Sequence, residues 1–259
     1  MKIPFYQIDA FTNRVFAGNP AGVCFLDAWI EEGMMQAIAA ENNLSETAFL
    51  VGKGGRYGLR WFTPTVEVDL CGHATLASAF AVFLEREPAA EKVTFLTRSG
   101  ELAVEREGER LLMDFPARRP APCAMPESIG DILGAVPVQA LSSRDLMLVY
   151  ETERQIRDLK PDMARVAALE HFAVIVTAPG SDCDFVSRFF APGAGVPEDT
   201  VTGSSHSTLI PYWSERLGKK ELRALQLSAR GGELFCRDRG ERVIIGGRAV
   251  LYLSGTLTL

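Results

Sequence analysis

Residues 67–84 read EVDLCGHATLASAFAVFL, and this stretch organises the fold. A polar, acidic segment leads into Cys71-Gly72-His73, and apolar residues then fill almost every position up to Leu84. Apolar residues on all sides predict a helix buried inside a domain. The first backbone N–H groups of a helix have no partner within it, and the helix dipole favours negative charge beside them. We therefore expect Gly72 to offer an anion site beside a thiol and an imidazole.

The second half of the chain repeats this arrangement. Thr202-Gly203-Ser204-Ser205-His206 leads into another apolar helical pattern, so Gly203 and Ser204 are expected to offer backbone donors as well. Residues 99–110 and 231–242 share six of twelve residues at an offset of 132. The alternative is a chance likeness of two charged hairpins, but both matches have nearly the same offset. The repeats therefore predict a tandem duplication that yields two similar domains.

The composition is that of an ordinary globular protein. The chain has 259 residues, 47% hydrophobic and 23% charged, which is enough for two modest domains. A net charge of −6 argues against binding to nucleic acid or to an anionic membrane. The five scattered cysteines form no CxxC pair, and there are three histidines. This argues against a disulfide framework and a structural zinc site, and it favours a cytoplasmic location. No signal peptide or membrane-spanning run is expected.

Strand and helix patterns suggest how the two halves are divided. Residues 116–122 contain three prolines, which cannot continue a helix or a central strand, so they predict a linker. The predicted domains are residues 1–117, joined by a last strand at 249–259, and residues 118–248. Apart from the two central helices, helices are expected at 31–41 and 161–170. Strands are expected at 3–10, 21–26, 47–51, 59–62, 92–95, 100–106, 110–115, 147–150, 172–177, 185–190, 225–227, 232–237 and 242–245.

Four short segments occur in order along both halves: GNPAGV at 18–23, NLSETAF at 43–49, DLCGHAT at 69–75 and EDTVTGSSH at 198–206. Together they resemble the phenazine-biosynthesis (PhzF-like) isomerase family, which shares its fold with diaminopimelate epimerase. The resemblance implies an α/β (α+β) protein whose halves are each a barrel-like, mostly antiparallel sheet around a central helix. It also implies an isomerase without cofactor or metal. Such an enzyme would bind a small carboxylic acid in the cleft between the halves and could form a homodimer.

The resemblance also points to catalytic residues. Glu46 matches the family's base, and His73 and Asp199 match its other polar catalytic positions. A shielded carboxylate is a suitable general base, although Glu46 could also be a solvated charge at a helix–strand junction. His73 is expected to be neutral, because a helix start disfavours a cation, and its alternative role is packing. Asp199 could orient the substrate or relay a proton, or it could be only a turn residue.

Five residues are expected to bind the substrate. The resemblance implies Asn19 and Ser45. The starts of the two central helices contribute Gly72, Gly203 and Ser204, whose backbone N–H groups could hold a carboxylate or a developing enolate.

Cys71 bears on the choice between isomerase and epimerase. Epimerase relatives place a Cys-Gly pair at the start of each central helix, whereas here Thr202 stands at the second position. A hydroxyl is too weak a base to replace a thiol, so Cys71 is expected to be inert. The alternative is a thiol made reactive by the helix start. The leading prediction is a double-bond isomerase. An amino-acid or hydroxy-acid racemase or epimerase, and a non-catalytic carboxylate-binding protein, remain alternatives.

Overall fold

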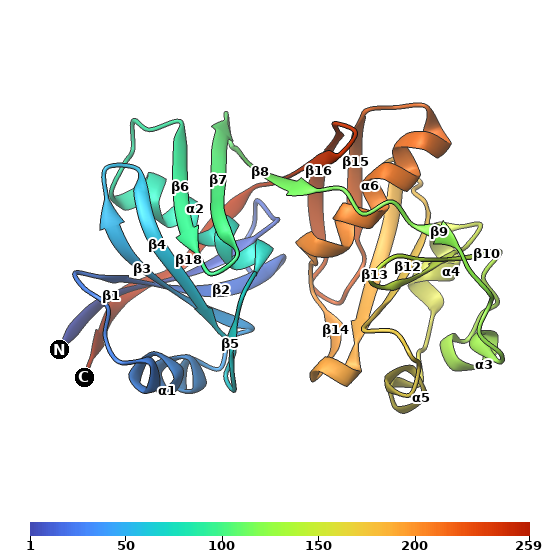
Figure 1. The fold of residues 1–259 in the computed structure, drawn as a ribbon, viewed down its shortest axis with the longest axis horizontal. Helices are drawn as coiled ribbons and strands as arrows, with labels where there is room; N and C mark the ends of the chain where they lie inside the picture. Colours follow the sequence, from blue (N-terminus) through green and yellow to red (C-terminus); the bar gives the residue numbers. More distant parts are fainter. The chain divides into compact units, whose positions relative to one another are not determined.

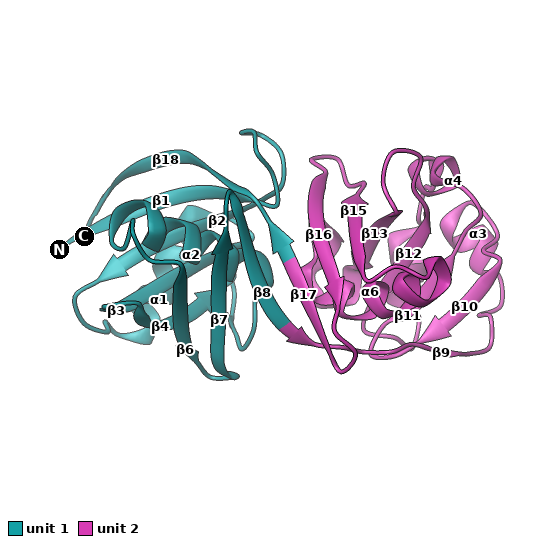
Figure 2. Cartoon of the chain, turned by 90° about the horizontal axis from the view of Figure 1, so that it is seen from above, with its two compact units in different colours: residues 1–114, 246–259 teal, residues 115–245 magenta.

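The computed structural model describes all residues, 1–259, and they divide into two compact units. Unit 1 comprises Met1–Asp114 and Gly246–Leu259, and unit 2 comprises Phe115–Ile245 (Figure 2). The chain crosses from unit 1 to unit 2 within β8 (Arg110–Pro116) and returns within β17 (Arg242–Gly247). Each unit therefore has its own core.

Unit 1 holds both ends of the chain (Figure 1). Its other elements are β1 (Lys2–Ala10), β2 (Asn19–Leu26), α1 (Glu32–Asn42), β3 (Glu46–Lys53), β4 (Arg56–Phe62), β5 (Glu67–Val68), α2 (Gly72–Glu85), β6 (Lys92–Thr97), β7 (Gly100–Glu107) and β18 (Ala249–Thr258). The last strand pairs with the first over its whole length, so the end of the chain completes the unit where the chain began.

The sheet of unit 1 is mostly antiparallel. β1 lies between β18 and β2, and β3 pairs with β4 as a hairpin. Two pairings are parallel, β2 with β3 and β4 with β6. The predicted meander follows as antiparallel β6, β7 and β8.

Helix α2 fills the interior that this sheet surrounds. It contacts β1, β2, β3 and β18, and ten of its fourteen residues are buried. The apolar pattern on all sides of residues 72–85 explains this burial, because every face of the helix meets apolar surface. Helix α1 covers a second cluster, in which Met35 and Ile38 pack against Ile3 and Phe49.

Unit 2 contains the following further elements. They are β9 (Ala121–Pro122), α3 (Ile129–Leu133), β10 (Gln139–Ser142), β11 (Leu146–Val149), α4 (Glu153–Asp158), α5 (Met163–Ala167), β12 (Val174–Pro179), β13 (Phe185–Ala191), the 3-10 turn Pro192–Ala194, β14 (Val196–Asp199), α6 (Gly203–Leu217), β15 (Glu221–Gln226) and β16 (Gly232–Asp238).

The strands of unit 2 pair in the same order as those of unit 1. β11 pairs in parallel with β12, β12 forms a hairpin with β13, and β13 pairs in parallel with β15. Helix α6 packs on β15 and β16 and, like α2, precedes the last meander. This shared order favours the predicted tandem duplication.

A proline inside α6 is compensated from another segment. The carbonyl of Ser207 would normally accept the N–H of residue 211, but Pro211 has none. The backbone N–H of Arg118 donates to this carbonyl instead, at 2.8 Å. The linker after β8 is therefore fixed to the central helix of unit 2.

One helix prediction is wrong in its extent. The helix expected at 161–170 is the short α5, which Asp162 caps by accepting the N–H groups of Ala164 and Arg165. It ends at Ala167, five residues before the sequence turns apolar again at Phe172. The capping box of Thr152 and Gln155, which starts the separate helix α4, was not foreseen.

No helix of the structure combines the length and the apolar character needed to cross a membrane.

Replacement of Gly18 tests how closely the loop before β2 approaches β1. Its φ is +65°, and a Cβ there would lie 2.1 Å from the carbonyl oxygen of Ala10. Gly54 has φ +64° with no atom near its missing Cβ, so it is a matched control. We expect Gly54→Ala to lower the free energy of unfolding by about 1–2 kcal/mol through backbone strain alone. Gly18→Ala should cost about 1–3 kcal/mol more, because of the clash. Denaturant unfolding measures both, and equal losses would contradict the close approach.

Candidate functional site

The start of α2 is held by its own backbone and a threonine. Cys71 is the residue before the first turn, with extended backbone (φ −140°, ψ 110°), and its side chain caps no N–H group. Its carbonyl accepts both the N–H and the hydroxyl of Thr75, at 3.0 and 2.6 Å. The helix therefore begins with side-chain-uncapped N–H groups at Gly72 and His73, as anion binding at a helix start requires.

Glu46 and His73 form a buried pair beside this helix start. Glu46 is the first residue of β3, which pairs in parallel with β2 so that Glu46 lies opposite Ala21. Its Oε2 lies 2.9 Å from Nε2 of His73, and the two side chains are 17% and 7% exposed. The structure thus brings two of the three predicted catalytic residues into contact, although 27 positions separate them in the sequence.

The other edge of the His73 ring faces an amide and a thiol. Nδ2 of Asn19, the first residue of β2, lies 3.2 Å from Nδ1 of His73. Sγ of Cys71 lies 3.5 Å from the same nitrogen. Asn19 therefore belongs to this cluster, whereas Ser45 lies exposed at the residue before β3.

The charge of His73 differs from the sequence expectation. Burial by itself would lower the pKa of His73, but its interactions with Cys71 and Glu46 outweigh burial and raise this pKa well above its usual value. The expectation of a neutral imidazole was wrong, because a carboxylate in contact stabilises the cation more than the helix start disfavours it. The pair is therefore an imidazolium beside a carboxylate.

Cys71 is a poor base in this setting. Burial raises the pKa of its thiol, and the nearby Glu46 carboxylate raises it further, while His73 opposes the shift only in part. The protonated thiol is the stable form, and a thiol is neither the nucleophile nor the base that the thiolate would be. This agrees with the expectation of an inert Cys71.

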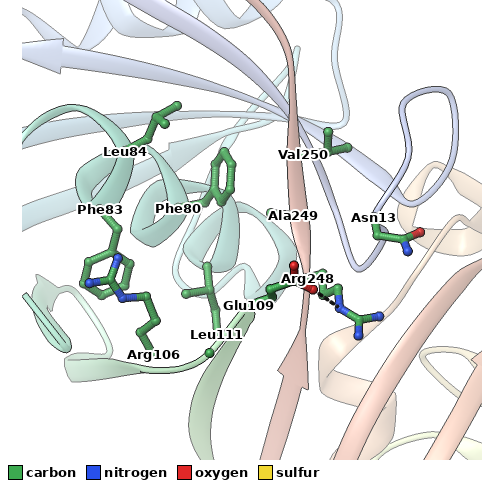
Figure 3. A pocket seen from close by; sticks show the side chains of 11 residues that line it. Asn13, Phe80, Phe83, Leu84, Arg106, Glu109, Leu111, Arg248, Ala249 and Val250 are labelled. Carbon is green, nitrogen blue, oxygen red and sulfur yellow. Dashed lines mark ion pairs between the residues drawn. The ribbon is translucent and has the colours of Figure 1, made fainter. Parts of the chain in front are cut away.

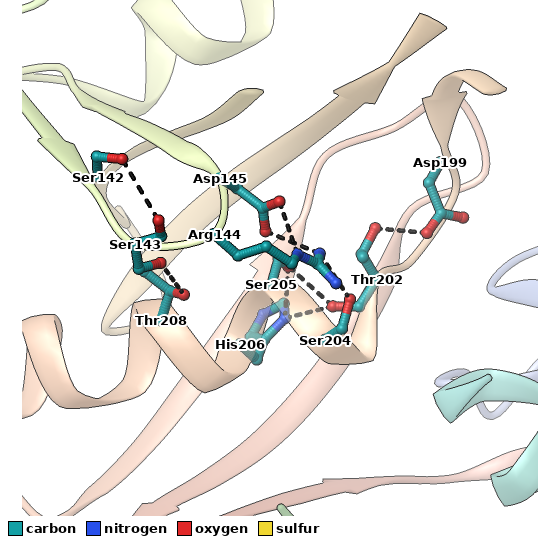
Figure 4. A network of polar contacts seen from close by, with 10 residues as sticks. All are labelled: Ser142, Ser143, Arg144, Asp145, Asp199, Thr202, Ser204, Ser205, His206 and Thr208. Carbon is teal, nitrogen blue, oxygen red and sulfur yellow. Dashed lines mark hydrogen bonds and ion pairs between the residues drawn. The ribbon is translucent and has the colours of Figure 1, made fainter. Parts of the chain in front are cut away.

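Asp199 lies in unit 2, beside the start of α6 (Figure 4). Its Oδ2 accepts a 2.6 Å hydrogen bond from the hydroxyl of Thr202, the residue that precedes α6 as Cys71 precedes α2. Gln226 fixes this corner. Its Nε2 donates to the Asp199 carbonyl and to Thr202 Oγ1, and its Oε1 accepts the Thr202 N–H.

His206 has the opposite electrostatics to His73. Its Nδ1 donates to the carbonyl of Thr202 at 2.8 Å, and the side chain is fully buried. Burial without a carboxylate lowers its pKa to about 4. His206 is therefore a neutral structural residue, which fixes the first turn of α6.

Arg144 is the polar residue that the sequence analysis missed. It lies in the turn between β10 and β11 and makes two hydrogen bonds to the buried carboxylate of Asp145, at 2.9 and 2.8 Å. Figure 4 shows its guanidinium reaching the start of α6, where Nη2 lies 3.5 Å from Oγ of Ser204. Ser143, in the same turn, contacts Thr208 at 3.1 Å and so ties the turn to the helix. No local signal in Ser143-Arg144-Asp145 indicates this contact.

A second arginine adds positive charge to this region of unit 2. Nη1 of Arg118 is buried and makes no hydrogen bond. Burial and repulsion by Arg144 lower the pKa of Arg118, and Asp145 only partly offsets this. Gly203 and Ser204 therefore begin a helix beside two arginines and two aspartates, so the feature that favours an anion there is the set of uncapped backbone N–H groups.

The cavity in unit 1 lies elsewhere, along the second half of α2 (Figure 3). It measures about 410 Å³, and its walls include Phe80, Phe83 and Leu111 together with the ion pair of Arg248 and Glu109. None of the predicted site residues lines it, and it offers no general base like the Glu46–His73 pair.

The comparisons with known proteins agree with one another. The family model described as "Phenazine biosynthesis-like protein" matches residues 8–255. A Pseudomonas aeruginosa protein named as an uncharacterized isomerase is 54% identical, with all of both chains covered. The crystal structure of a PhzF-family phenazine biosynthesis protein from Enterococcus faecalis has a TM-score of 0.98 at 46% identity, again over all of both chains.

A more distant structure supports the fold alone. A hydroxyproline epimerase from Agrobacterium vitis has a TM-score of 0.60 at 10% identity, over 99% of this chain and 92% of its own. The predicted α/β fold of the epimerase type is therefore confirmed.

The raised pKa of His73 predicts how stability varies with pH. An unfolded histidine has a pKa near 6.5, so above about pH 6.5 the folded state binds more protons than the unfolded state. The free energy of unfolding should then fall by up to about 1.4 kcal/mol per pH unit until the pH passes the folded pKa, and the contribution is fully present below pH 6.5. Glu46→Gln removes the carboxylate that, together with Cys71, raises this pKa, and it should make the slope less steep.

Denaturant unfolding of both proteins from about pH 6 to pH 9 measures the effect. His206, whose pKa is lowered to about 4, makes stability rise with pH up to about pH 7, but it does so equally in both proteins, so the difference between their slopes is due to Glu46. If the free energy of unfolding varied with pH in the same way in both proteins, Glu46 would not be what raises the pKa of His73.

Proposed function

Because the chain belongs to the phenazine biosynthesis-like protein family, we propose that it is an isomerase which moves a proton, and with it a double bond, on a small carboxylic acid. The buried contact between Glu46 and His73 beside the start of α2 carries this proposal. The family match supports isomerase chemistry in general. The residues of the site support the more specific proposal of a double-bond shift on a small carboxylic acid.

Glu46 is proposed as the base. One of its oxygens faces Nε2 of His73, and 17% of the side chain remains exposed, which leaves the carboxylate within reach of a substrate. In this mechanism Glu46 takes a proton from one carbon and returns it to another on the same face. A single base is sufficient for such a shift, whereas inversion of a centre needs a second group on the opposite face.

His73 is proposed to act as a cation that holds the carboxylate and stabilises charge. Its imidazolium orients Glu46 through Nε2, while Asn19 and Cys71 fix the ring at Nδ1. When Glu46 becomes protonated, the charge of His73 partly compensates the negative charge on the enolate-like intermediate.

The substrate carboxylate is proposed to bind in the cleft that the family resemblance implies. Backbone N–H groups at Gly72 and at Gly203 and Ser204 are its proposed donors, since both helices begin without a side-chain cap. The guanidinium of Arg144, which lies 3.5 Å from Oγ of Ser204, is a further donor that supports an anionic substrate. Asp199, hydrogen-bonded to Thr202, is proposed to orient the substrate's polar groups.

Replacement of Glu46 tests the base. Glu46→Gln keeps the shape but cannot accept a proton, so the chemical step should slow by ~10²–10⁴-fold while substrate binding changes little. The assay is deuterium incorporation from heavy water into a panel of unsaturated carboxylic acids, followed by NMR, with calorimetric binding alongside. Glu105→Gln, on the exposed strand β7, is the control. Wild-type exchange in Glu46→Gln would transfer the role to Asp199 or His73.

The epimerase alternative rests on Cys71, which contacts His73 at the start of α2. Thr202, at the corresponding place before α6, has its hydroxyl bound to Asp199, so no pair of thiols is present. Cys71→Ser should therefore keep activity within roughly tenfold, about 1.4 kcal/mol of barrier. Loss of turnover in a folded Cys71→Ser protein would favour an epimerase.

Tight binding without any exchange in the wild type would instead favour the binding-protein alternative.

A further inference from the structure

Three different metal-binding donors converge at the start of α2. A carboxylate oxygen of Glu46, a ring nitrogen of His73 and Sγ of Cys71 all lie within 4.8 Å of one another. From this geometry we propose that the cluster binds one thiophilic divalent cation, such as Zn²⁺ or Co²⁺, as an inhibitor. The sequence argued against a structural zinc site with CxxC spacing, and the family resemblance implied a reaction without metal; an inhibitory ion held by Cys71 and His73 together with Glu46 from another segment differs from both.

Two of the donor–donor distances lie within about 0.5 Å of those of a tetrahedral site, although Sγ of Cys71 lies nearer to Nδ1 of His73, at 3.5 Å, than to Nε2. With metal–sulfur bonds of about 2.3 Å and bonds to nitrogen or oxygen of about 2.0–2.2 Å, sulfur and nitrogen lie about 3.5 Å apart and nitrogen and oxygen about 3.3 Å apart. In the structure Cys71 Sγ lies 3.9 Å from His73 Nε2, and Glu46 Oε2 lies 2.9 Å from the same nitrogen. Small side-chain rotations would bring both distances to these values.

The charges balance when a cation binds. Cys71 loses its thiol proton and His73 loses the proton on Nε2, and both protons pass to solvent. The sulfur, the nitrogen and the Glu46 oxygen then each donate a lone pair to the metal. A divalent cation with one thiolate and one carboxylate is neutral overall, so the buried site carries no net charge. Burial favours the thiol in the empty site, but a coordinated metal supplies the positive charge that stabilises the thiolate.

The surroundings support three protein ligands with an open fourth position. The side-chain amide of Asn19 lies against Nδ1 of His73, with Nδ2 at 3.2 Å, and a turn of this amide would place its oxygen there to accept Nδ1–H and orient the ring for coordination through Nε2. In metal sites with three protein ligands a water takes the fourth position, and here 17% of the Glu46 side chain is exposed while Oε2 itself is buried.

Inhibition follows from the position of the metal and rests on the proposed function. A cation on Oε2 of Glu46 would neutralise the proposed base and displace the proton from its partner His73. Binding itself does not depend on that function. Its test therefore uses a spectroscopic signal that requires no substrate, and failure of one proposal leaves the other standing.

Cobalt absorption tests the site directly. One equivalent of Co²⁺ added to the reduced wild-type protein should produce a thiolate-to-cobalt charge-transfer band in the near ultraviolet. Zn²⁺ should abolish this band by displacement, because it binds such sites more tightly than Co²⁺. Cys71→Ser should lose the band and bind Co²⁺ at least ~100-fold more weakly. Even the loss of a residue that only hydrogen-bonds to a metal ligand lowers metal affinity by about 10–100-fold, and Cys71 is itself a ligand.

Two further variants keep the experiment decisive. Cys123→Ser removes a cysteine of unit 2 that is not one of the three donors and should keep the band in full. Glu46→Gln should keep a thiolate band but weaken binding. Circular dichroism verifies that each variant is folded. The proposal is overturned if the wild type gives no saturable band, or if folded Cys71→Ser gives the same band as the wild type.

Discussion

The contact between the Glu46 carboxylate and the His73 imidazolium is the interaction on which the chemistry of unit 1 depends. An isolated charge of either sign would be unstable where so little of the side chain is exposed, so each charged group stabilises the other. The contact also joins the first residue of β3 to the second residue of α2, which places a proton acceptor beside uncapped backbone N–H groups. Removing either partner leaves an uncompensated buried charge, which is why the pair is both a structural and a chemical feature.

The two units have the same plan but different electrostatics. In unit 1 the central helix begins beside a carboxylate, and the pKa of His73 rises. In unit 2 Ser204 stands at the position of His73, and the histidine of the first turn, His206, has no carboxylate partner, so its pKa falls. Unit 2 instead carries cationic groups near its helix start, with Arg144 held in place by Asp145. The proposed base therefore lies in unit 1, whereas unit 2 has an arginine and uncapped backbone N–H groups at its helix start.

Cys71 shows how one residue can be inert in one reaction and reactive in another. As a base it is disabled, because burial and the neighbouring carboxylate stabilise its proton. As a metal ligand it is favoured, since a cation would reverse that balance and the other donors are already in place. The same buried negative charge therefore protects the thiol from acid–base chemistry and prepares it for metal binding.

The sequence by itself determined the features that depend on local pattern. The buried helices beginning at Gly72 and Gly203, the meanders that follow them and the family segments could all be read from periodicity and motif, because backbone conformation there follows from neighbouring residues. Three features were decided by contacts between distant segments: the charge of His73, the approach of Arg144 to Ser204, and the bond from Arg118 that compensates for Pro211. The pKa of a buried group depends on which charge lies within a few ångströms of it, and spacing along the chain does not contain that distance.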